Sequence, residues 1–365
     1  MKAIATTPGS KELRIVEREE PKIYEADDIK IKITQIGICG TDREIAHGGR
    51  ADAPAGSNEL VLGHEMIGIV VEIGKDVKKV KVGDHALFTV RRACGSCYAC
   101  ANGRNDMCST GNYTERGIRG RDGYMTEYVV DKELYCVKIP DNIVDLGVLT
   151  EPISVSVKAV DEAVKIQAAR IPGATYDTWL NGKKVLVVGL GPIGLLGAFI
   201  LRLRGADVLG MDIVEENSPR ASLLKEIGGN YINGKTISAD LIDDTYGQID
   251  MVFEAAGVAK LGFDLIDALG INGVYVLTGV PGAGRPVDIS GGALMQQMVL
   301  MNQVMVGSVN ASMQHNLMAL DVIANSKKTW PGSLEKVITE VMPYTKIKEA
   351  IANTSSDEIK TIITF

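Results

Sequence analysis

The stretch Val185-Leu-Val-Val-Gly189-Leu-Gly191-Pro-Ile-Gly194 decides the fold of the second half of the chain. Its apolar residues predict a buried strand, and the glycines follow that strand directly and open a helix. The first glycine permits a tight turn, the second lets the backbone approach a pyrophosphate, and the third lets helix and strand pack closely. The competing interpretation is an ordinary strand–helix turn. We predict that a dinucleotide binds at Gly189, Leu190, Gly191, Pro192, Ile193 and Gly194.

Asp212 ends the next predicted strand and indicates which dinucleotide is used. A carboxylate at this point can accept hydrogen bonds from both ribose hydroxyls, and it repels a 2′-phosphate. Glu215 and Glu216 add negative charge, and the next arginine along the chain is Arg220. The alternative for Asp212 is a solvated turn residue. The sequence therefore predicts NAD as the preferred cofactor, with NADP still possible.

Outward from the glycine loop, strands alternate with helices. This alternation predicts parallel βαβ units and a doubly wound sheet. The predicted strands are 185–189, 208–212, 251–253 and 274–277, the helices are 193–204, 220–227 and 261–269, and the apolar run 304–309 could extend the sheet.

The first 140 residues have a different pattern, with short strands separated by glycine turns. The predicted strands are 29–36, 66–73, 85–90 and 124–130. This pattern predicts a β-rich, barrel-like domain, and we expect a final strand at 360–365 to return to it.

Length and charge limit the classes of function. A chain of 365 residues exceeds the usual size of a single core, so two domains are expected. The net charge of −7 and the lack of a basic stripe argue against nucleic acid as a partner. The apolar stretch 185–203 contains four glycines, a proline and an arginine, so no membrane span is predicted. The charged N-terminal segment lacks a signal-peptide core, and cysteine usage favours a reducing compartment, so we expect a cytoplasmic protein.

Four of the six cysteines stand together at C-x2-C-x2-C-x7-C spacing. Four thiolates can surround one Zn²⁺ tetrahedrally, and no coordination position then remains open for chemistry. The alternatives are disulfides, unrelated core cysteines or an iron–sulfur cluster. We predict a structural zinc lobe, at about residues 91–110, held by Cys94, Cys97, Cys100 and Cys108.

Cys39 and the pair His64-Glu65 suggest a second metal site. Cysteine, histidine and carboxylate side chains are zinc ligands, and three protein ligands leave a fourth position for substrate or water. Taken alone, such residues are more often found in a core. Each of these, however, follows a predicted strand and is flanked by glycines, which places it on a loop.

With these motifs in order, the whole chain resembles the zinc-dependent medium-chain dehydrogenase/reductase superfamily. The matching segments are Cys39-Gly-Thr-Asp42, Gly63-His-Glu65, Val82-Gly-Asp84, the four-cysteine lobe and the glycine loop. The resemblance implies an α/β protein with a GroES-like catalytic domain at 1–155 and 312–365 and a Rossmann dinucleotide-binding domain at 156–311.

Within the superfamily the chain is most similar to the archaeal-type glucose (aldose) dehydrogenases. Alcohol dehydrogenases place a second cysteine ligand before the nucleotide domain, whereas this chain has Thr150-Glu151-Pro152 there. The resemblance implies Glu151 as the third ligand, with Glu65 approaching the metal in some states. A helix N-terminal carboxylate is the alternative role for Glu151.

The resemblance also implies roles around the substrate. Thr41 would relay a proton, Asp42 would support the metal ligands, and Glu115 and Asn310 would hold sugar hydroxyls. Asn310 would also reach the nicotinamide, whose pocket would be lined by Gly279 and Val280.

The implied reaction is zinc-assisted hydride transfer from C1 of an aldose such as glucose, galactose or xylose to the nicotinamide, giving the lactone. The alternative on the same scaffold is a polyol (sorbitol-type) or threonine dehydrogenase. The acidic charge disfavours a zinc-ribbon nucleic-acid binder, and the presence of Cys39, His64 and Glu151 disfavours a silent dinucleotide-binding protein. The apolar run 301–309 and the resemblance predict a homo-oligomer, either a dimer or a tetramer.

Overall fold

The computed structural model describes residues 1–282 and 286–365, which form two compact units. The first contains Met1–Ser154, Asn310–Ala324 and Ile338–Phe365, and the second contains Val155–Val309 and Asn325–Val337. The expected boundaries assigned 312–365 wholly to the first domain, whereas the structure groups Asn325–Val337 with the second unit. Two contacts explain this grouping. Ser333 donates a hydrogen bond to Glu226 at 2.6 Å, and Trp330 packs edge-on against Phe199.

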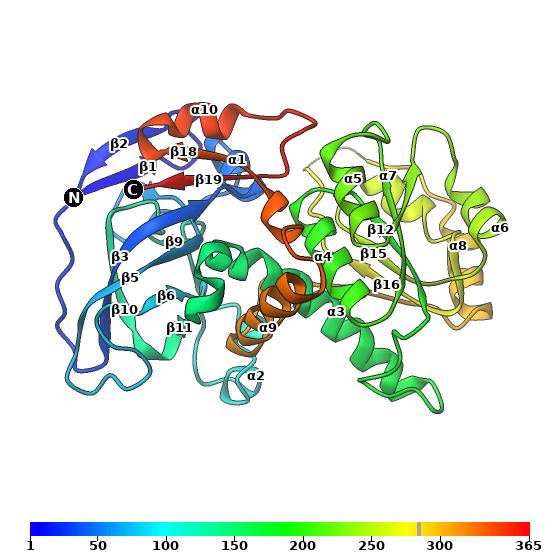
Figure 1. The fold of residues 1–365 in the computed structure, drawn as a ribbon, viewed down its shortest axis with the longest axis horizontal. Coiled ribbons are helices and arrows are strands. Elements are labelled where there is room, and N and C mark those ends of the chain that lie inside the picture. Colours follow the sequence, from blue (N-terminus) through cyan, green and yellow to red (C-terminus); the bar gives the residue numbers. More distant parts are fainter. Residues whose placement is uncertain (283–285) are drawn as a thin grey trace. The chain divides into compact units, whose positions relative to one another are not determined.

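The first unit is built on a mixed sheet with strand order β11-β6-β5-β3-β19-β18, and β10 also pairs with β3. Both chain ends lie in this unit, and the C-terminal strand β19 runs antiparallel to β3 (Figure 1). The strands are β3 (Asp28–Gly37), β5 (Glu65–Ile73), β6 (His85–Phe88), β10 (Tyr128–Lys132), β11 (Cys136–Lys138), β18 (Ile338–Pro343) and β19 (Lys360–Thr364).

The strand predicted at 124–130 begins only at Tyr128. The preceding residues instead make backbone bonds to a neighbouring loop, from the N–H of Tyr124 to the carbonyl of Gly63 and from the N–H of Met125 to that of Leu62.

Two small sheets and several short helices complete the first unit. The sheets have the orders β2-β1-β4 and β7-β8-β9. Their strands are β1 (Lys2–Thr6), β2 (Arg14–Glu17), β4 (Leu60–Val61), β7 (Arg91–Arg92), β8 (Thr114–Arg116) and β9 (Gly120–Arg121). The helices are α1 (Gly40–Ala46), α2 (Tyr98–Ala101), α10 (Ile347–Ala352) and the 3₁₀ helices η1 (Asn105–Met107), η2 (Glu133–Tyr135), η3 (Asp141–Leu149) and η6 (Tyr344–Lys346).

The second unit contains the predicted parallel sheet, with strand order β14-β13-β12-β15-β16-β17. Every neighbouring pair in it is parallel, and the first strand in the chain, β12, lies in the middle with later strands added on both sides. This order confirms the doubly wound architecture. The strands are β12 (Lys184–Val188), β13 (Asp207–Asp212), β14 (Asn230–Asn233), β15 (Ile249–Glu254), β16 (Leu269–Leu277) and β17 (Val304–Gly307). The helices are α4 (Pro192–Leu203), α5 (Pro219–Glu226), α6 (Ile242–Tyr246), α7 (Ala259–Asp264), α8 (Gly291–Leu300) and the 3₁₀ helices η4 (Ala239–Leu241) and η5 (Leu334–Val337).

Two long helices cross the division between the units in sequence, α3 (Thr150–Arg170) and α9 (Met313–Thr329).

The helix predicted at 261–269 is too long by five residues. Helix α7 ends at Asp264, and Leu269 already belongs to β16, where it pairs with Ile249. Sheet pairing thus overrides the helical spacing of the apolar residues.

In the described parts of the chain, none of the helices combines the length and apolar character that crossing a bilayer requires.

Candidate active site

The glycine loop joins β12 to α4 within the second unit. Gly189 has φ +83°, and a Cβ there would lie 2.9 Å from the backbone of Ala256. A Cβ on Gly194 would collide with the carbonyl oxygen of Gly189, whereas a Cβ on Gly191 would meet nothing within 4 Å. The first and third glycines are therefore required by packing, and the second leaves open space at the helix N-terminus, where backbone N–H groups can receive a phosphate. Leu190, Pro192 and Ile193 complete this turn.

Asp212 lies at the end of β13 and is tied to the glycine loop. Its Oδ2 accepts a hydrogen bond from the N–H of Leu190 at 2.7 Å, and its Oδ1 accepts one from the N–H of Ile213. Arg220 Nη1 lies 3.9 Å from Oδ2. The carboxylate therefore stands beside the phosphate-binding turn, as a ribose-binding carboxylate must.

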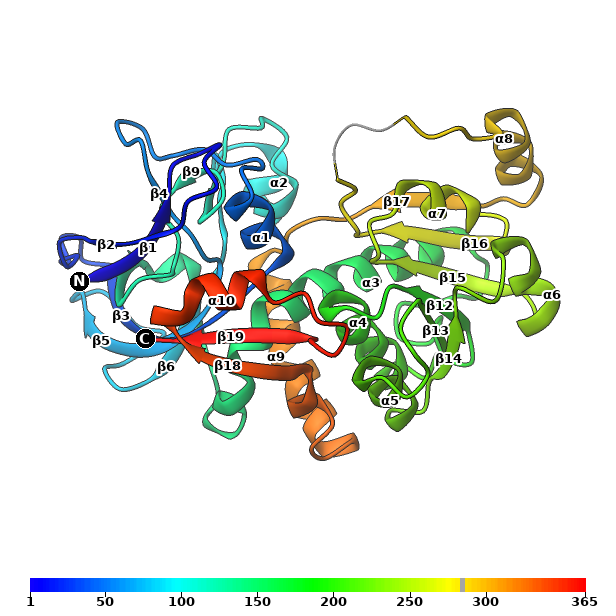
Figure 2. The same cartoon turned by 90° about the horizontal axis from the view of Figure 1, so that it is seen from above.

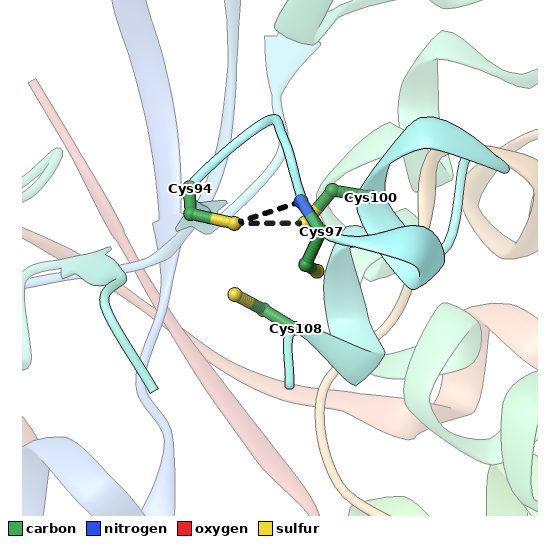
Figure 3. A group of neighbouring side chains, drawn as sticks. All are labelled: Cys94, Cys97, Cys100 and Cys108. Carbon is green, nitrogen blue, oxygen red and sulfur yellow. Dashed lines mark hydrogen bonds between the residues drawn. The ribbon is translucent and has the colours of Figure 1, made fainter. Parts of the chain in front are cut away.

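The four clustered cysteines point their sulfur atoms toward one another (Figure 3). Their Sγ atoms all lie within 4.8 Å of one another, and the distance from Cys94 Sγ to Cys100 Sγ is 3.9 Å. Tetrahedral Zn–S bonds of about 2.3 Å would place sulfurs about 3.8 Å apart. All four are free thiols, so the geometry fits a zinc ion and not disulfides.

Backbone N–H groups lower the pKa of two cysteines of this lobe. The N–H groups of Cys97 and Ser96 lower the pKa of Cys94 to about 5, and those of Cys100 and Ser109 lower the pKa of Cys97 to about 7. Burial and the adjacent thiols raise the pKa of Cys100 to about 12. Lowered pKa values at Cys94 and Cys97, in a cluster of four converging sulfur atoms, suit a cation that binds thiolates, such as Zn²⁺.

A second group of metal-ligand side chains lies elsewhere in the first unit. Ligand atoms of Cys39, His64 and Glu65 lie within 4.8 Å of one another, although residues 39 and 64 are far apart in sequence. Cys39 immediately precedes α1, and Glu65 begins β5, where it pairs with Gly37 at the end of β3. Antiparallel pairing of β3 with β5 therefore brings the two loops together.

Asp42 lies behind the histidine of this group. It is completely buried, its Oδ2 accepts a hydrogen bond from the N–H of Cys39 at 2.9 Å, and its Oδ1 lies 3.6 Å from His64 Nδ1. Burial lowers the pKa of His64, but the carboxylate of Asp42 and the Cys39 thiol outweigh it and raise that pKa well above its ordinary value. Neither Asp42 Oδ1 nor His64 Nδ1 has a hydrogen-bond partner among the described residues. Buried acceptors and a thiol around one imidazole fit a cation, and zinc suits this donor set.

Lys360 contacts this group, and the sequence analysis did not identify it. It is 2% exposed, it forms an ion pair with Glu65, and its Nζ donates a hydrogen bond to the carbonyl of Ile38 at 2.9 Å. Burial lowers its pKa, but Glu65 and Cys39 outweigh burial and raise it. The ion pair therefore fixes the position of the Glu65 side chain beside Cys39 and His64. A lone lysine in an apolar final strand was the only sequence signal for it.

Glu151 and Thr41 stand near this group without joining it. Glu151, in the first turn of α3, lies outside the set of mutually close ligand atoms. Burial raises the pKa of Glu151 to about 7, while the charge of His64 lowers it and that of Glu65 raises it. Thr41 is partly exposed in the first turn of α1, two residues after Cys39.

The two residues expected to hold sugar hydroxyls contact each other. Asn310 Nδ2 donates to Glu115 Oε1 at 2.8 Å across 195 residues of sequence. Asn310 has φ +61°, and its Oδ1 accepts a hydrogen bond from the N–H of Ala311. Glu115 Oε1 also accepts two bonds from Arg91, a residue that the sequence analysis did not single out.

Gly279 and Val280 follow β16 in the second unit. A Cβ on Gly279 would approach Glu254 Oε2 to 2.7 Å, while the Val280 side chain is 58% exposed. The backbone here therefore packs against the loop after β15 and leaves an apolar side chain open to a ligand.

Comparison with known proteins agrees with this geometry. A family model described as "Glucose dehydrogenase C-terminus" matches residues 144–365, and one described as "Alcohol dehydrogenase GroES-like domain" matches residues 25–141. The chain belongs to the glucose dehydrogenase family. This family is one of zinc-dependent medium-chain dehydrogenases, so the expected family and the expected pairing of a GroES-like domain with a Rossmann-like domain are both confirmed.

Similar proteins extend over the full length of the chain. A glucose 1-dehydrogenase from Methanocella arvoryzae is 35% identical over 98% of each chain. Glucose 1-dehydrogenase 2 from Vulcanisaeta moutnovskia is 38% identical over 100% of this chain and 99% of its own. The structure of Haloferax mediterranei glucose dehydrogenase in complex with NADP, Zn and gluconolactone has a TM-score of 0.89 and 32% identity, covering 100% of this chain and 99% of that one.

Proposed function

We propose that this glucose dehydrogenase family member oxidises an aldose at C1 to the lactone and reduces a nicotinamide cofactor. The C1 hydroxyl loses its proton, the C1–H bond delivers a hydride to the nicotinamide ring, and NAD⁺ becomes NADH. The Haloferax mediterranei glucose dehydrogenase structure contains NADP, Zn and gluconolactone, and its similarity to this chain supports the same reaction here.

The observation that best supports a sugar substrate is the hydrogen bonding of the Glu115 carboxylate. Three donors, two from Arg91 and one from Asn310, saturate its Oε1, while Oε2 has no partner among the described residues. An oriented carboxylate oxygen of this kind accepts a substrate hydroxyl, and it would remain unsatisfied beside a simple alkyl alcohol.

The other site residues would bind the metal, transfer the proton and orient the cofactor. Cys39, His64 and a glutamate, either Glu65 or Glu151, would hold the catalytic metal, and Asp42 orients His64. A zinc ion bound there supplies Lewis acidity that lowers the pKa of the substrate hydroxyl. Thr41 passes the proton toward solvent, and the glycine loop with Asp212 orients the cofactor. A second zinc in the four-cysteine lobe has no open position and is structural.

Initial rates with a panel of substrates test this function. We expect glucose, galactose or xylose to be the best substrate, with ethanol poorer by about 10⁴-fold in kcat/KM, because the site leaves polar groups unpaired beside it. Sorbitol or threonine turning over faster than every aldose would replace the proposal with a polyol or threonine dehydrogenase.

We further propose that NAD is preferred over NADP. The support is the Asp212 carboxylate beside the phosphate-binding turn, whose negative charge opposes a 2′-phosphate. Asp212→Arg should shift the ratio of kcat/KM values toward NADP by about tenfold or more, or about 1.4 kcal/mol. Asp212→Asn, which keeps an acceptor for the Leu190 N–H, should shift it less. A wild-type enzyme equally good with NADP would contradict the proposal, and Glu349→Arg is the remote charge control.

We also propose that the protein is a homodimer or tetramer joined through the second unit. Strand β17 is at one end of the parallel sheet, and α8, which precedes it in the chain and stands off from the sheet in Figure 2, has no buried residue. Its Met295, Val299 and Leu300 side chains are at least 70% exposed. An uncovered edge strand beside an apolar helix is suited to a second copy of the chain.

Light scattering tests the assembly. The wild-type mass should be two or four times 39.1 kDa, and Leu300→Asp should shift it toward 39.1 kDa because a carboxylate would be buried in the interface. Tyr24→Asp, at an exposed aromatic residue of the first unit, should leave the mass unchanged. A wild-type mass of one chain at working concentration would refute the proposal.

A further inference from the structure

We infer that Arg91 is a positioning residue for substrate recognition, which fixes the Glu115 carboxylate by tying it to the backbone of the four-cysteine lobe. The inference rests on the proposed function only in taking Glu115 as a residue that receives substrate hydroxyls. It gives the lobe a second role besides stability, because the lobe becomes part of the frame that aims a substrate-binding group.

The strand pairing places Arg91 directly against Glu115. Arg91 is in β7, three residues before Cys94, and its antiparallel partner in β8 is Glu115. Its side chain is buried, with 5% of the residue exposed. The Glu115 side chain is 14% exposed, so the arginine and the carboxylate form a pair that is largely shielded from water.

The guanidinium group uses its two edges for different partners. Nε and Nη2 donate to Glu115 Oε1 at 3.1 and 2.9 Å, while Nη1 donates to the carbonyl oxygen of Asp106 at 2.6 Å. The guanidinium also stacks on the Tyr113 ring at 4.0 Å. These contacts leave the planar group one orientation, and a flexible ammonium could not reproduce them together.

The far end of this link is anchored in the lobe. Asp106 lies in η1, between Cys100 and Cys108, and is 4% exposed. Its carboxylate accepts two hydrogen bonds from Arg104, at 3.0 and 2.8 Å, which hold the backbone segment that offers its carbonyl to Arg91. Arg91 therefore transmits the position of the lobe backbone to Glu115.

At the Glu115 side of this link, one carboxylate oxygen remains available. Arg91 and Asn310 together bind Oε1, so Oε2 points where the pair directs it. If Arg91 no longer holds Oε1, the carboxylate gains rotamers and bonds to the substrate only part of the time. Affinity for the hydroxylated substrate then falls, whereas affinity for the dinucleotide does not.

Kinetics of Arg91→Lys and Arg91→Gln test the inference. We expect the KM for glucose to rise about tenfold or more, because a bidentate, stacked arginine is replaced. The KM for NAD should stay within about twofold, and zinc content should match wild type.

Arg92→Lys is the matched control. Arg92 is the next residue of the same strand, equally buried and bidentate to Asp131, but it makes no bond to Glu115. It should lower Tm without raising the sugar KM.

A double-mutant cycle separates positioning from general structure. In a Glu115→Ala background, Arg91→Lys should change the sugar KM by less than about twofold, because the group it positions is gone. An equal rise in both backgrounds, or the same rise in Arg92→Lys, would overturn the inference. The wild-type arm tests the proposed function separately. If sorbitol or another hydroxylated compound proves to be the substrate, the same cycle measured with it decides the role of Arg91.

Discussion

Replacing Cys39 by serine will lower kcat/KM for the sugar by about 10³-fold, or about 4 kcal/mol, while the protein stays folded. The thiol belongs to the group formed with His64 and Glu65, and serine is a poor zinc ligand. Zinc measured by atomic absorption should fall from two ions per chain to one, because the four-cysteine lobe is untouched. Near-wild-type Tm would show that the loss is catalytic.

Cys136 provides the control for this substitution. It is the cysteine outside both clusters, buried in β11, and burial raises its pKa to about 12, so it remains a neutral thiol. Cys136→Ser makes the same chemical change and should retain both zinc ions and activity. Wild-type turnover in Cys39→Ser would show that Cys39 is not part of the catalytic site.

Replacing Cys97 by serine should have the opposite profile and destabilise the fold. The segment 94–108, which carries the four cysteines, has little secondary structure, only α2 and η1, so we expect its conformation to depend on bonds to a metal. Structural zinc supplies about 10–16 kcal/mol in isolated zinc-finger peptides, and loss of one ligand should lower the free energy of unfolding by several kcal/mol, on the order of 5. Thermal unfolding and protease sensitivity within the lobe measure this loss.

The zinc count distinguishes this variant from Cys39→Ser. One ion should remain, bound at the site of Cys39 and His64, so a fraction of the activity should survive at low temperature. The residual activity should also show a raised KM for the sugar, because a disordered lobe would no longer hold Arg91, which positions Glu115. A Cys97→Ser protein with two zinc ions and an unchanged Tm would contradict a structural metal in the lobe.

Much of the fold and the four-cysteine lobe could be predicted because their signals are local. The lobe cysteines lie within 15 residues, and the glycine loop directly follows its strand, so spacing alone places these groups together. Cys39 and His64 stand on separate loops, so spacing alone does not place them together. Their residue types and the family resemblance suggested a shared metal site, and the structure brings them together through the pairing of β3 with β5.

Lys360 and Arg91 could not be predicted because burial depends on tertiary contacts. A lysine at the start of a final strand and an arginine before a cysteine run are ordinary surface residues in sequence. Only the pairing of β19 with β3 brings Lys360 to Glu65, and only the pairing of β7 with β8 brings Arg91 to Glu115. The contact of Asn310 with Glu115 is likewise long-range.

The exposed helix α8 was missed for a related reason. Its sequence, Gly-Gly-Ala-Leu-Met-Gln-Gln-Met-Val-Leu, has no polar face of the kind that marks a surface helix.

The most direct test of the central claim is anomalous diffraction at the zinc edge from crystals grown with NAD and gluconolactone. We predict two peaks per chain, one among Cys94, Cys97, Cys100 and Cys108, the other bounded by Cys39, His64 and a glutamate. The lactone should lie beside the second peak, with a hydroxyl on Glu115. A single peak in the lobe, or a lactone bound away from Cys39 and Glu115, would contradict the account.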